Sequence, residues 1–159
     1  MSEKKIKVIS ADIDATLTWG FQGISETNAQ AIRDLIDQGY LFGVASGRAY
    51  NDLMHYPEMW GIGRTFDFYI GLNGASLYDE ATKKNEVFFE IEKEYIRLLV
   101  EEIDRMGLDC HIYVHGITLF SKESERLKKL RKSGYREFVV AKDLSEMYAE
   151  KTSKILINV

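Results

Sequence analysis

The sequence predicts an α/β protein built on a parallel sheet, and three observations carry this prediction. Residues 6–11, 41–45 and 68–72 form apolar runs of the length of buried strands. A stretch of helical periodicity separates the first two runs, which indicates a strand–helix–strand unit with a right-handed parallel crossover. Each run ends in a polar cluster. Because the carboxyl ends of parallel strands meet at one edge of a sheet, we expect the three clusters to lie together.

The first strand carries two carboxylates, Asp12 and Asp14, at its carboxyl end, and Thr16 follows two residues later. Side chains alternate along a strand, so the two carboxylates share a face if the strand stays regular. A pair of carboxylates can hold a divalent cation, or can divide the roles of nucleophile and acid/base. An isolated pair of this kind is more often a simple turn, so the later elements decide between these interpretations.

The segment after Ser25 has the pattern of an amphipathic helix. Ser25 is a favoured N-cap residue, and Gly39 stands where a helix C-terminal glycine belongs. Apolar residues recur between them at helical spacing: Ala29, Ile32, Leu35 and Ile36. We therefore expect a helix that connects the first strand to the second.

Ser-Gly-Arg at residues 46–48 follows the second strand, and Asn-Gly-Ala at residues 73–75 follows the third. Hydrogen-bonding groups after three consecutive strands favour a functional site over three unrelated turns. Arg48 is always charged, so a buried guanidinium at a strand end requires an anionic partner. A phosphate would serve, and so would the carboxylates of Asp12 and Asp14.

Three aromatic residues lie just beyond the first two motifs: Trp19, Phe21 and Tyr50. They can line the entrance to a site, but we expect them to pack against the neighbouring helix, because aromatic side chains contribute most when their large apolar surface is buried.

These motifs resemble those of the haloacid dehalogenase-like (HAD) superfamily, and most closely those of its Cof-type sugar-phosphate phosphatases. The first family motif, an apolar strand that runs into Asp-x-Asp-x-Thr, is similar to residues 8–17. Residues 46–48 resemble the second motif, and residues 73–75 resemble the Asn-Gly-Ala of the Cof-type group. Ala15 departs from the group, which mostly has glycine there. The resemblance covers the whole chain, but only the first 75 residues or so carry specific motifs.

The resemblance implies a Mg²⁺-dependent phosphohydrolase that acts on a small phosphorylated metabolite through an aspartyl-phosphate. In this scheme Asp12 is the nucleophile, Asp14 is the general acid and base, and Thr16 orients Asp14 and its turn. Mg²⁺ is held by Asp12 and the backbone carbonyl of Asp14. The residues implied to contact the phosphoryl group follow the second and third strands: Ser46, whose hydroxyl donates to a phosphoryl oxygen, with Gly47, Arg48 and Asn73.

The resemblance also implies two lobes: a partial HAD-like α/β core with a three-stranded parallel sheet at residues 1–79, and an α+β cap of type C2 at residues 80–159. No proline-rich or low-complexity linker marks the boundary. The pattern after residue 75 predicts the following elements in order: a hairpin of residues 75–78 and 87–90, a helix at 93–106, a second hairpin that turns at His115-Gly116, two further helical stretches, and a final strand at 155–159.

The family's catalytic core has two further strands after the cap, which carry a lysine and an acidic metal-binding loop. No such acidic loop follows Asp143, and we expect Lys151 and Lys154 to be solvated residues beside the last strand. The chain is therefore expected to match the first part of a capped phosphatase with impaired activity, whether as a natural remnant, a split gene product or an engineered shortened chain. The alternative is a non-catalytic fragment that binds ligands or oligomerises. A phospho-accepting receiver domain fits less well, because its acceptor Asp would stand at Asn73.

Composition predicts a soluble cytoplasmic protein without membrane or nucleic-acid partners. The net charge of −4 disfavours nucleic-acid binding, and we expect the basic run at residues 126–136 to be a solvated helix face rather than an anion-binding patch. No signal peptide is visible, and no apolar run reaches the roughly 20 residues that span a membrane. Without strands beyond the cap, the apolar first strand becomes a sheet edge. This predicts a homo-oligomer.

Overall fold

The computed structural model describes residues 6–19, 23–131 and 138–158. The chain divides into two compact units, Met1–Glu86 and Val87–Val159, and each unit has its own sheet and hydrophobic core. In the part of the chain that the structure describes, every helix is too short or too polar to cross a membrane.

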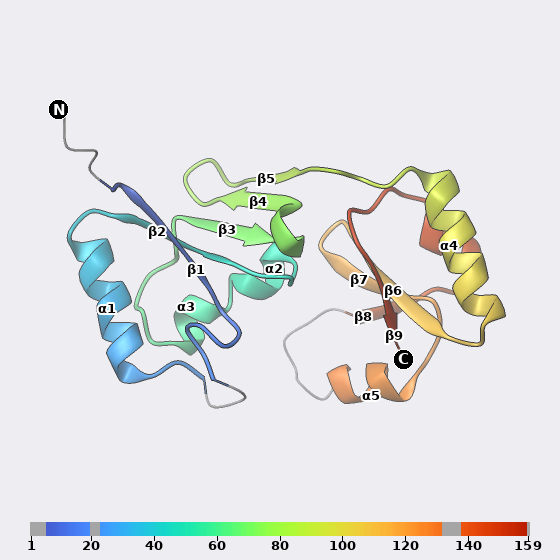
Figure 1. Ribbon diagram of the computed structural model, residues 1–159, viewed down its shortest axis with the longest axis horizontal. Helices are drawn as coiled ribbons and strands as arrows, with labels where there is room; N and C mark the ends of the chain where they lie inside the picture. The colour runs from blue at the N-terminus through green and yellow to red at the C-terminus, as the bar shows by residue number, and fades with distance from the viewer. Residues whose placement is uncertain (1–5, 20–22, 132–137, 159) are drawn as a thin grey trace. The chain divides into compact units, whose positions relative to one another are not determined.

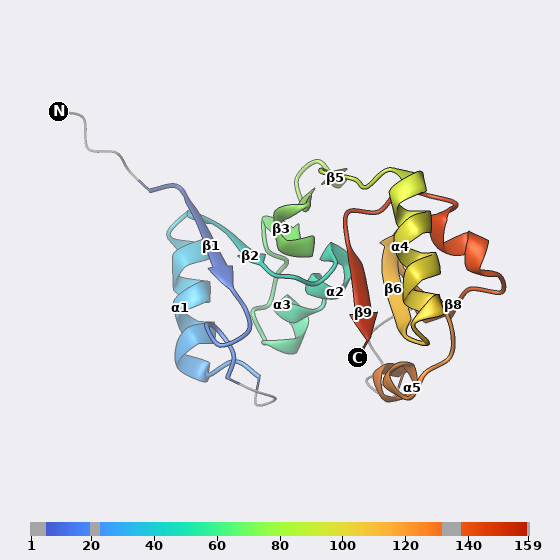
Figure 2. The ribbon, with the colours of Figure 1, turned by 45° about the vertical axis from the view of Figure 1, so that its right-hand side comes forward.

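The first unit is built on a five-stranded sheet with the strand order β1-β2-β3-β4-β5 (Figures 1 and 2). The three expected strands are parallel, and β4 adds to them in antiparallel orientation. The elements follow in chain order: β1 (Val8–Asp12), α1 (Glu26–Asp37), β2 (Leu41–Ala45), α2 (Tyr50–Leu53), α3 (Tyr56–Met59), β3 (Phe68–Gly71), the 3-10 helix η1 (Leu72–Gly74), β4 (Ser76–Asp79) and β5 (Lys84–Val87). The prediction of a strand at residues 87–90 was wrong, because β5 already ends at Val87. The prediction of a three-stranded sheet was also too small, because β4 and β5 extend the sheet beyond β3.

Helix α1 begins and ends where the sequence predicts. The Oγ of Ser25 accepts a hydrogen bond of 3.1 Å from the backbone N–H of Asn28, which satisfies one of the free donors at the helix start. Gly39, just beyond the helix, has φ 85°, a left-handed conformation that glycine adopts without strain. Between these two residues, Ala29 and Ile32 are buried in the core of the unit.

The helices of the first unit pack on one face of its sheet. One core joins strands and helices, and it includes Ile9, Ala11, Ala29, Ile32, Phe42, Val44, Leu53 and Tyr56. Side chains of the alternate register lie on the opposite face, where Val8 and Leu41 pair with each other and are 54% and 49% exposed. Because β1 is also at one end of the strand order, this face and the β1 edge of the sheet are open within the described residues.

The second unit has a four-stranded sheet with the order β8-β7-β6-β9. Its elements follow in chain order: α4 (Lys93–Arg105), β6 (Asp109–Val114), β7 (Ile117–Phe120), α5 (Glu125–Arg131), β8 (Phe138–Val140), the 3-10 helix η2 (Leu144–Tyr148) and β9 (Ile155–Asn158). The expected hairpin turn at His115 and Gly116 is confirmed, and both residues have the positive φ, 48° and 82°, that a tight two-residue turn requires.

Helix α4 lies beside β6 in both ribbon views and buries one stripe of its surface against the sheet (Figures 1 and 2). Ile96, Val100 and Ile103 form this stripe and share a core with Met147 of η2. In helix α5, Lys128 pairs with Glu125 at 2.7 Å, as expected for a solvated helix. The end of the basic run, residues 132–137, lies outside the described residues.

Candidate active site

The polar clusters of the first three strands meet at the carboxyl edge of the first sheet, as the sequence predicts. A pocket of about 230 Å³ opens there. The described residues that line it are Asp12, Ala45, Ser46, Gly47, Asn73 and Gly74. The fold thus brings Asp12, Ser46 and Asn73 together from three separate strand ends.

Backbone hydrogen bonds fix the loops around this pocket. The N–H of Asn73 donates to the carbonyl of Ser46 at 3.1 Å, and the N–H of Leu72 donates to the carbonyl of Arg48 at 2.8 Å. Leu72 and Asn73 have φ of 52° and 61°, which are uncommon for residues with a side chain. A strained turn after β3 therefore holds Asn73 against Ser46, and strain of this kind clusters at functional sites.

Thr16 is bonded to the Asp12 carboxylate. Its Oγ1 donates a hydrogen bond of 3.0 Å to Oδ2 of Asp12. The resemblance implied a contact with Asp14, and the structure gives Thr16 this contact with Asp12 instead. Ala15, which lies between them in the chain, has φ 63°, so the position where the Cof-type group mostly has glycine does need a left-handed residue.

Arg48 forms an ion pair with Asp14, one of the two kinds of anionic partner expected from the sequence. Its Nη2 lies 3.0 Å from Oδ1 and 3.3 Å from Oδ2 of Asp14. Burial opposes the charge of Arg48, but the neighbouring Tyr56 and the hydrogen bond to Asp14 outweigh it, so the pKa of Arg48 is raised. Neither Arg48 nor Asp14 is among the described residues that line the pocket beside Asp12.

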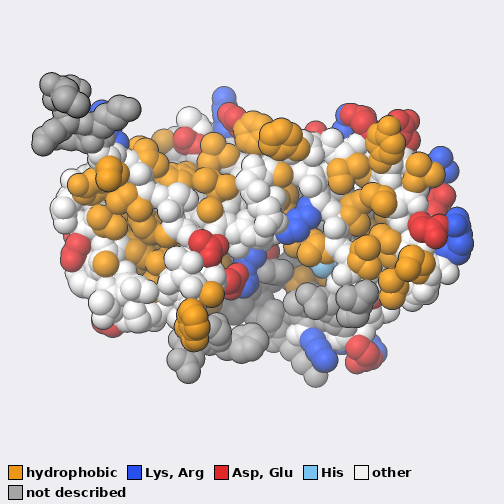
Figure 3. Space-filling model, in the orientation of Figure 1, with side chains coloured by type: hydrophobic (Ala, Val, Ile, Leu, Met, Phe, Trp, Pro, Cys, Tyr) orange, Lys and Arg blue, Asp and Glu red, His pale blue; other side chains and the backbone are white. Residues whose placement is uncertain are grey.

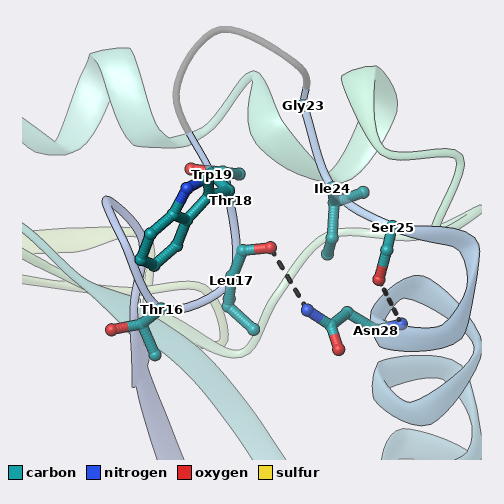
Figure 4. Close-up of a pocket in the computed structure, with 8 residues that line it drawn as sticks. All are labelled: Thr16, Leu17, Thr18, Trp19, Gly23, Ile24, Ser25 and Asn28. Atoms are coloured by element: carbon teal, nitrogen blue, oxygen red, sulfur yellow. Dashed lines mark hydrogen bonds between the residues drawn. The ribbon is translucent and has the colours of Figure 1, made fainter.

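A second pocket, of about 220 Å³, opens in the loop between β1 and α1 (Figure 4). It is lined by Thr16, Leu17, Thr18, Trp19, Gly23, Ile24, Ser25 and Asn28. Asn28 Nδ2 donates to the carbonyl of Leu17 at 3.3 Å and ties the loop to α1. Thr16 lines this pocket and is bonded to Asp12, so the two pockets are linked through one side chain. In the sequence, Ser25 and Asn28 are recognisable only as the start of a helix.

The aromatic residues near these motifs differ in their surroundings. Trp19 is 76% exposed beside the second pocket, so the expectation that it packs on a helix was wrong. Tyr50 is the first residue of α2, and its ring stacks on that of Tyr78 in β4 with 5.0 Å between the centroids, so it packs on a strand and not on a neighbouring helix as expected. Phe21 lies outside the described residues. The sequence around an aromatic residue that follows a strand motif does not show whether its side chain will be exposed or packed.

The sequence model of the haloacid dehalogenase-like hydrolases matches residues 9–159. The chain belongs to this family. Two curated Buchnera aphidicola proteins, each named as a candidate phosphatase, are also similar. The one from subsp. Schizaphis graminum is 37% identical over 73 residues, which is 46% of this chain and 26% of the relative. The one from subsp. Baizongia pistaciae is 28% identical over 95 residues, 60% of this chain and 34% of the relative.

Several solved structures share the fold of this chain. A haloacid dehalogenase-like hydrolase from Bacteroides thetaiotaomicron superposes with a TM-score of 0.81 at 20% identity, over 96% of this chain and 58% of that protein. A sugar phosphatase of HAD subclass IIB gives a TM-score of 0.77 at 17% identity, over 95% and 58%. A Thermotoga maritima protein gives a TM-score of 0.77 at 24% identity, over 96% and 56%. This HAD-like chain therefore spans less than two thirds of each of these relatives.

The described residues of this HAD-like chain offer few ligands for a metal ion. No group of three or more His, Cys, Asp or Glu side chains within them can hold one. Asp12 brings one carboxylate to the pocket, and Ser46 and Asn73 bring neutral polar groups. Mg²⁺ often binds through one or two carboxylates and keeps several waters, so this donor set fits a weakly held Mg²⁺.

The two late lysines belong to the second unit. Lys151 pairs with Glu92 at 2.6 Å, and its side chain is 39% exposed, which agrees with a solvated residue. Lys154 is half-buried, and burial lowers its pKa. The prediction that the Lys154 side chain is solvated is therefore not met.

Proposed function

We propose that this HAD-like hydrolase transfers the phosphoryl group of a small cytoplasmic phosphate monoester to Asp12 and then to water. The observation that supports this proposal best is the pocket at the carboxyl ends of β1, β2 and β3, where Asp12, Ser46 and Asn73 come together. Hydroxyl and backbone groups around a single carboxylate suit an anion that is attacked by that carboxylate.

In the first step, an oxygen of Asp12 forms a bond to phosphorus while the ester P–O bond breaks, and Asp14 gives a proton to the leaving oxygen. In the second step, Asp14 takes a proton from water, the water oxygen bonds to phosphorus, and the bond to Asp12 breaks. Ser46 donates a hydrogen bond to a phosphoryl oxygen, where negative charge develops. Thr16 restrains the rotation of the Asp12 carboxylate.

Asp12 and the backbone carbonyl of Asp14 are the groups that would hold Mg²⁺, which lowers the repulsion between the carboxylate and the phosphate ester. Water would supply the remaining ligands. Because the described residues contribute a single pocket carboxylate, we expect weak Mg²⁺ binding and impaired turnover by these 159 residues alone.

We further propose that residues 80–159 form a type C2 cap, which excludes water from the site and reads the organic part of the substrate. A second candidate function is a non-catalytic module that binds ligands or oligomerises. A pocket that has one carboxylate beside neutral polar groups can bind an anion without hydrolysing it, which supports this second candidate.

Hydrolysis of p-nitrophenyl phosphate with Mg²⁺ separates the two candidates. We expect slow turnover by the wild-type chain, and loss of this turnover in Asp12→Asn. Asp34→Asn, at an exposed position of α1, is the matched control and should leave turnover unchanged. Turnover that survives Asp12→Asn would contradict the phosphatase proposal. An inactive wild type in which inorganic phosphate still shifts the amide signals of Ser46 and Asn73 would support the non-catalytic module.

A further inference from the structure

The guanidinium of Arg48 is directed to Asp14 and not to the phosphoryl pocket. A single nitrogen, Nη2, lies within hydrogen-bond distance of both carboxylate oxygens of Asp14, at 3.0 and 3.3 Å. The described residues that line the pocket include Asp12 but not Arg48. The partner that the structure gives Arg48 is therefore the second carboxylate of the motif.

The main chain of Arg48 is fixed on both sides. Its N–H lies 3.4 Å from Oγ of Ser46, and its carbonyl accepts a bond of 2.8 Å from the N–H of Leu72. A Cβ added to Gly71 would lie 2.9 Å from this carbonyl, so the surrounding backbone is closely packed. The guanidinium carbon lies 5.9 Å from the centre of the Tyr56 ring, close enough for a cation–π contact. The side chain thus reaches Asp14 from an anchored base.

The ion pair between Arg48 and Asp14 contributes little to the free energy of unfolding. The side chain of Arg48 is 37% exposed and that of Asp14 is 61% exposed, and half-exposed ion pairs are largely screened by solvent. A contact that orients a carboxylate without much effect on stability can be removed to test its role in the reaction.

We propose that Arg48 is a positioning residue that orients the Asp14 carboxylate to take a proton from the attacking water. The proposal rests on the proposed function, which assigns this proton transfer to Asp14. The charge-assisted hydrogen bonds from Arg48 Nη2 to both carboxylate oxygens, at 3.0 and 3.3 Å, fix the direction in which the Asp14 carboxylate points. In that step the proton passes from water to Asp14, the water oxygen bonds to phosphorus, and the electron pair of the broken bond returns to Asp12.

The two half-reactions separate this role from phosphate binding. p-Nitrophenolate leaves readily, so formation of the phospho-enzyme from p-nitrophenyl phosphate depends little on a proton donor. We expect Arg48→Met to leave the formation rate and KM of this substrate nearly unchanged. Decay of the phospho-enzyme after rapid removal of substrate should slow about tenfold or more, which is less than the roughly 10²–10⁴-fold contribution of a general base, because Asp14 itself is still present. Arg48→Lys should restore part of the decay rate.

A double-mutant cycle tests whether Arg48 acts through Asp14. Decay is already slow in Asp14→Asn, so adding Arg48→Met should cause no further change. Arg64→Met is the matched control, because Arg64 forms an exposed ion pair with Asp37 at 3.3 Å in the same unit. Thermal unfolding of each variant reports whether the fold is intact.

Each outcome bears on the proposal. A raised KM and a slower formation rate in Arg48→Met would overturn it in favour of direct phosphate binding. Additive effects in the double variant would overturn it as well. If the wild type forms phospho-enzyme and Arg48→Met decays at the wild-type rate, only the role of Arg48 is refuted. If the wild type forms no phospho-enzyme, the proposed function fails and this role fails with it.

Discussion

The hydroxyl of Thr16 donates a hydrogen bond of 3.0 Å to Oδ2 of Asp12, across the turn that follows β1. The bond uses one oxygen of the carboxylate that we propose as the nucleophile, and it links that carboxylate to the pocket between β1 and α1. A carboxylate that is held by a neighbour loses less freedom when it reacts.

Thr16→Val removes this bond and keeps the size of the side chain. We expect kcat to fall about tenfold, since a hydrogen bond to a charged group contributes about 1.5–3 kcal/mol. Thr16→Ser keeps the hydroxyl and should retain most of the activity. Steady-state kinetics on p-nitrophenyl phosphate measure both variants. Equal kcat values for the wild type and Thr16→Val would show that Asp12 needs no such support.

Ala15→Gly should stabilise the protein. Ala15 is exposed and has φ 63°, a conformation that costs a residue with a Cβ about 1–2 kcal/mol. Glycine removes this cost but gains freedom in the unfolded chain, so the expected net gain is about 0.5–1 kcal/mol. Ala75→Gly is the control, because Ala75 has φ −84° and should lose stability on the same change. Urea unfolding measures both, and a loss of stability in Ala15→Gly would contradict the strain.

Several elements could be predicted from the sequence because their signals are local. Ser25 and Gly39 mark the ends of α1, and His115-Gly116 marks the second hairpin. The pairing of Arg48 with Asp14 spans 34 residues, and no local pattern could choose between Asp14 and a phosphate as its partner. The strand predicted at residues 87–90 is β5 in the structure, at Lys84–Val87. All four residues of β5 are exposed, so the sequence has no alternation of apolar and polar residues that would locate this edge strand.

Tyr69 should make stability fall at alkaline pH. Burial raises the pKa of its phenol to about 12, although a hydrogen bond from the N–H of Phe66 opposes the shift. The pKa in the unfolded chain is about 10. The neutral phenol therefore stabilises the fold fully below about pH 10, and this contribution is lost as pH rises toward 12 by up to about 1.4 kcal/mol per pH unit.

Tyr69→Phe cannot ionise and provides the comparison. The variant should be less stable than the wild type at about pH 9, because it loses the bond from Phe66, which is worth about 1 kcal/mol. The gap should narrow or reverse at about pH 11. Urea unfolding at the two pH values measures this. A gap that stays constant would mean that Tyr69 ionises equally in the folded and unfolded chain.

The open edge and face of the first sheet should bring chains together. Ile6, Val8 and Leu41 are 70%, 54% and 49% exposed, and hydrophobic side chains lie at the surface over β1 (Figure 3). Exposed apolar surface beside an unpaired strand favours association. We expect a homodimer or larger oligomer by light scattering, and a shift toward monomer in Val8→Lys. Leu98→Lys, on the exposed side of α4, is the control and should not shift it. A wild-type monomer at every concentration would refute this prediction.

The most direct test of the account is to find the residue that carries the phosphoryl group. Asp14→Asn keeps the proposed nucleophile and slows its release, so this variant should accumulate phospho-enzyme when mixed with p-nitrophenyl phosphate and Mg²⁺. After acid quench and borohydride reduction, peptide mass spectrometry should find homoserine at position 12, with none in Asp12→Asn. Label at another residue, or no phospho-enzyme in a folded and Mg²⁺-saturated protein, would contradict the assignment of Asp12 as the nucleophile.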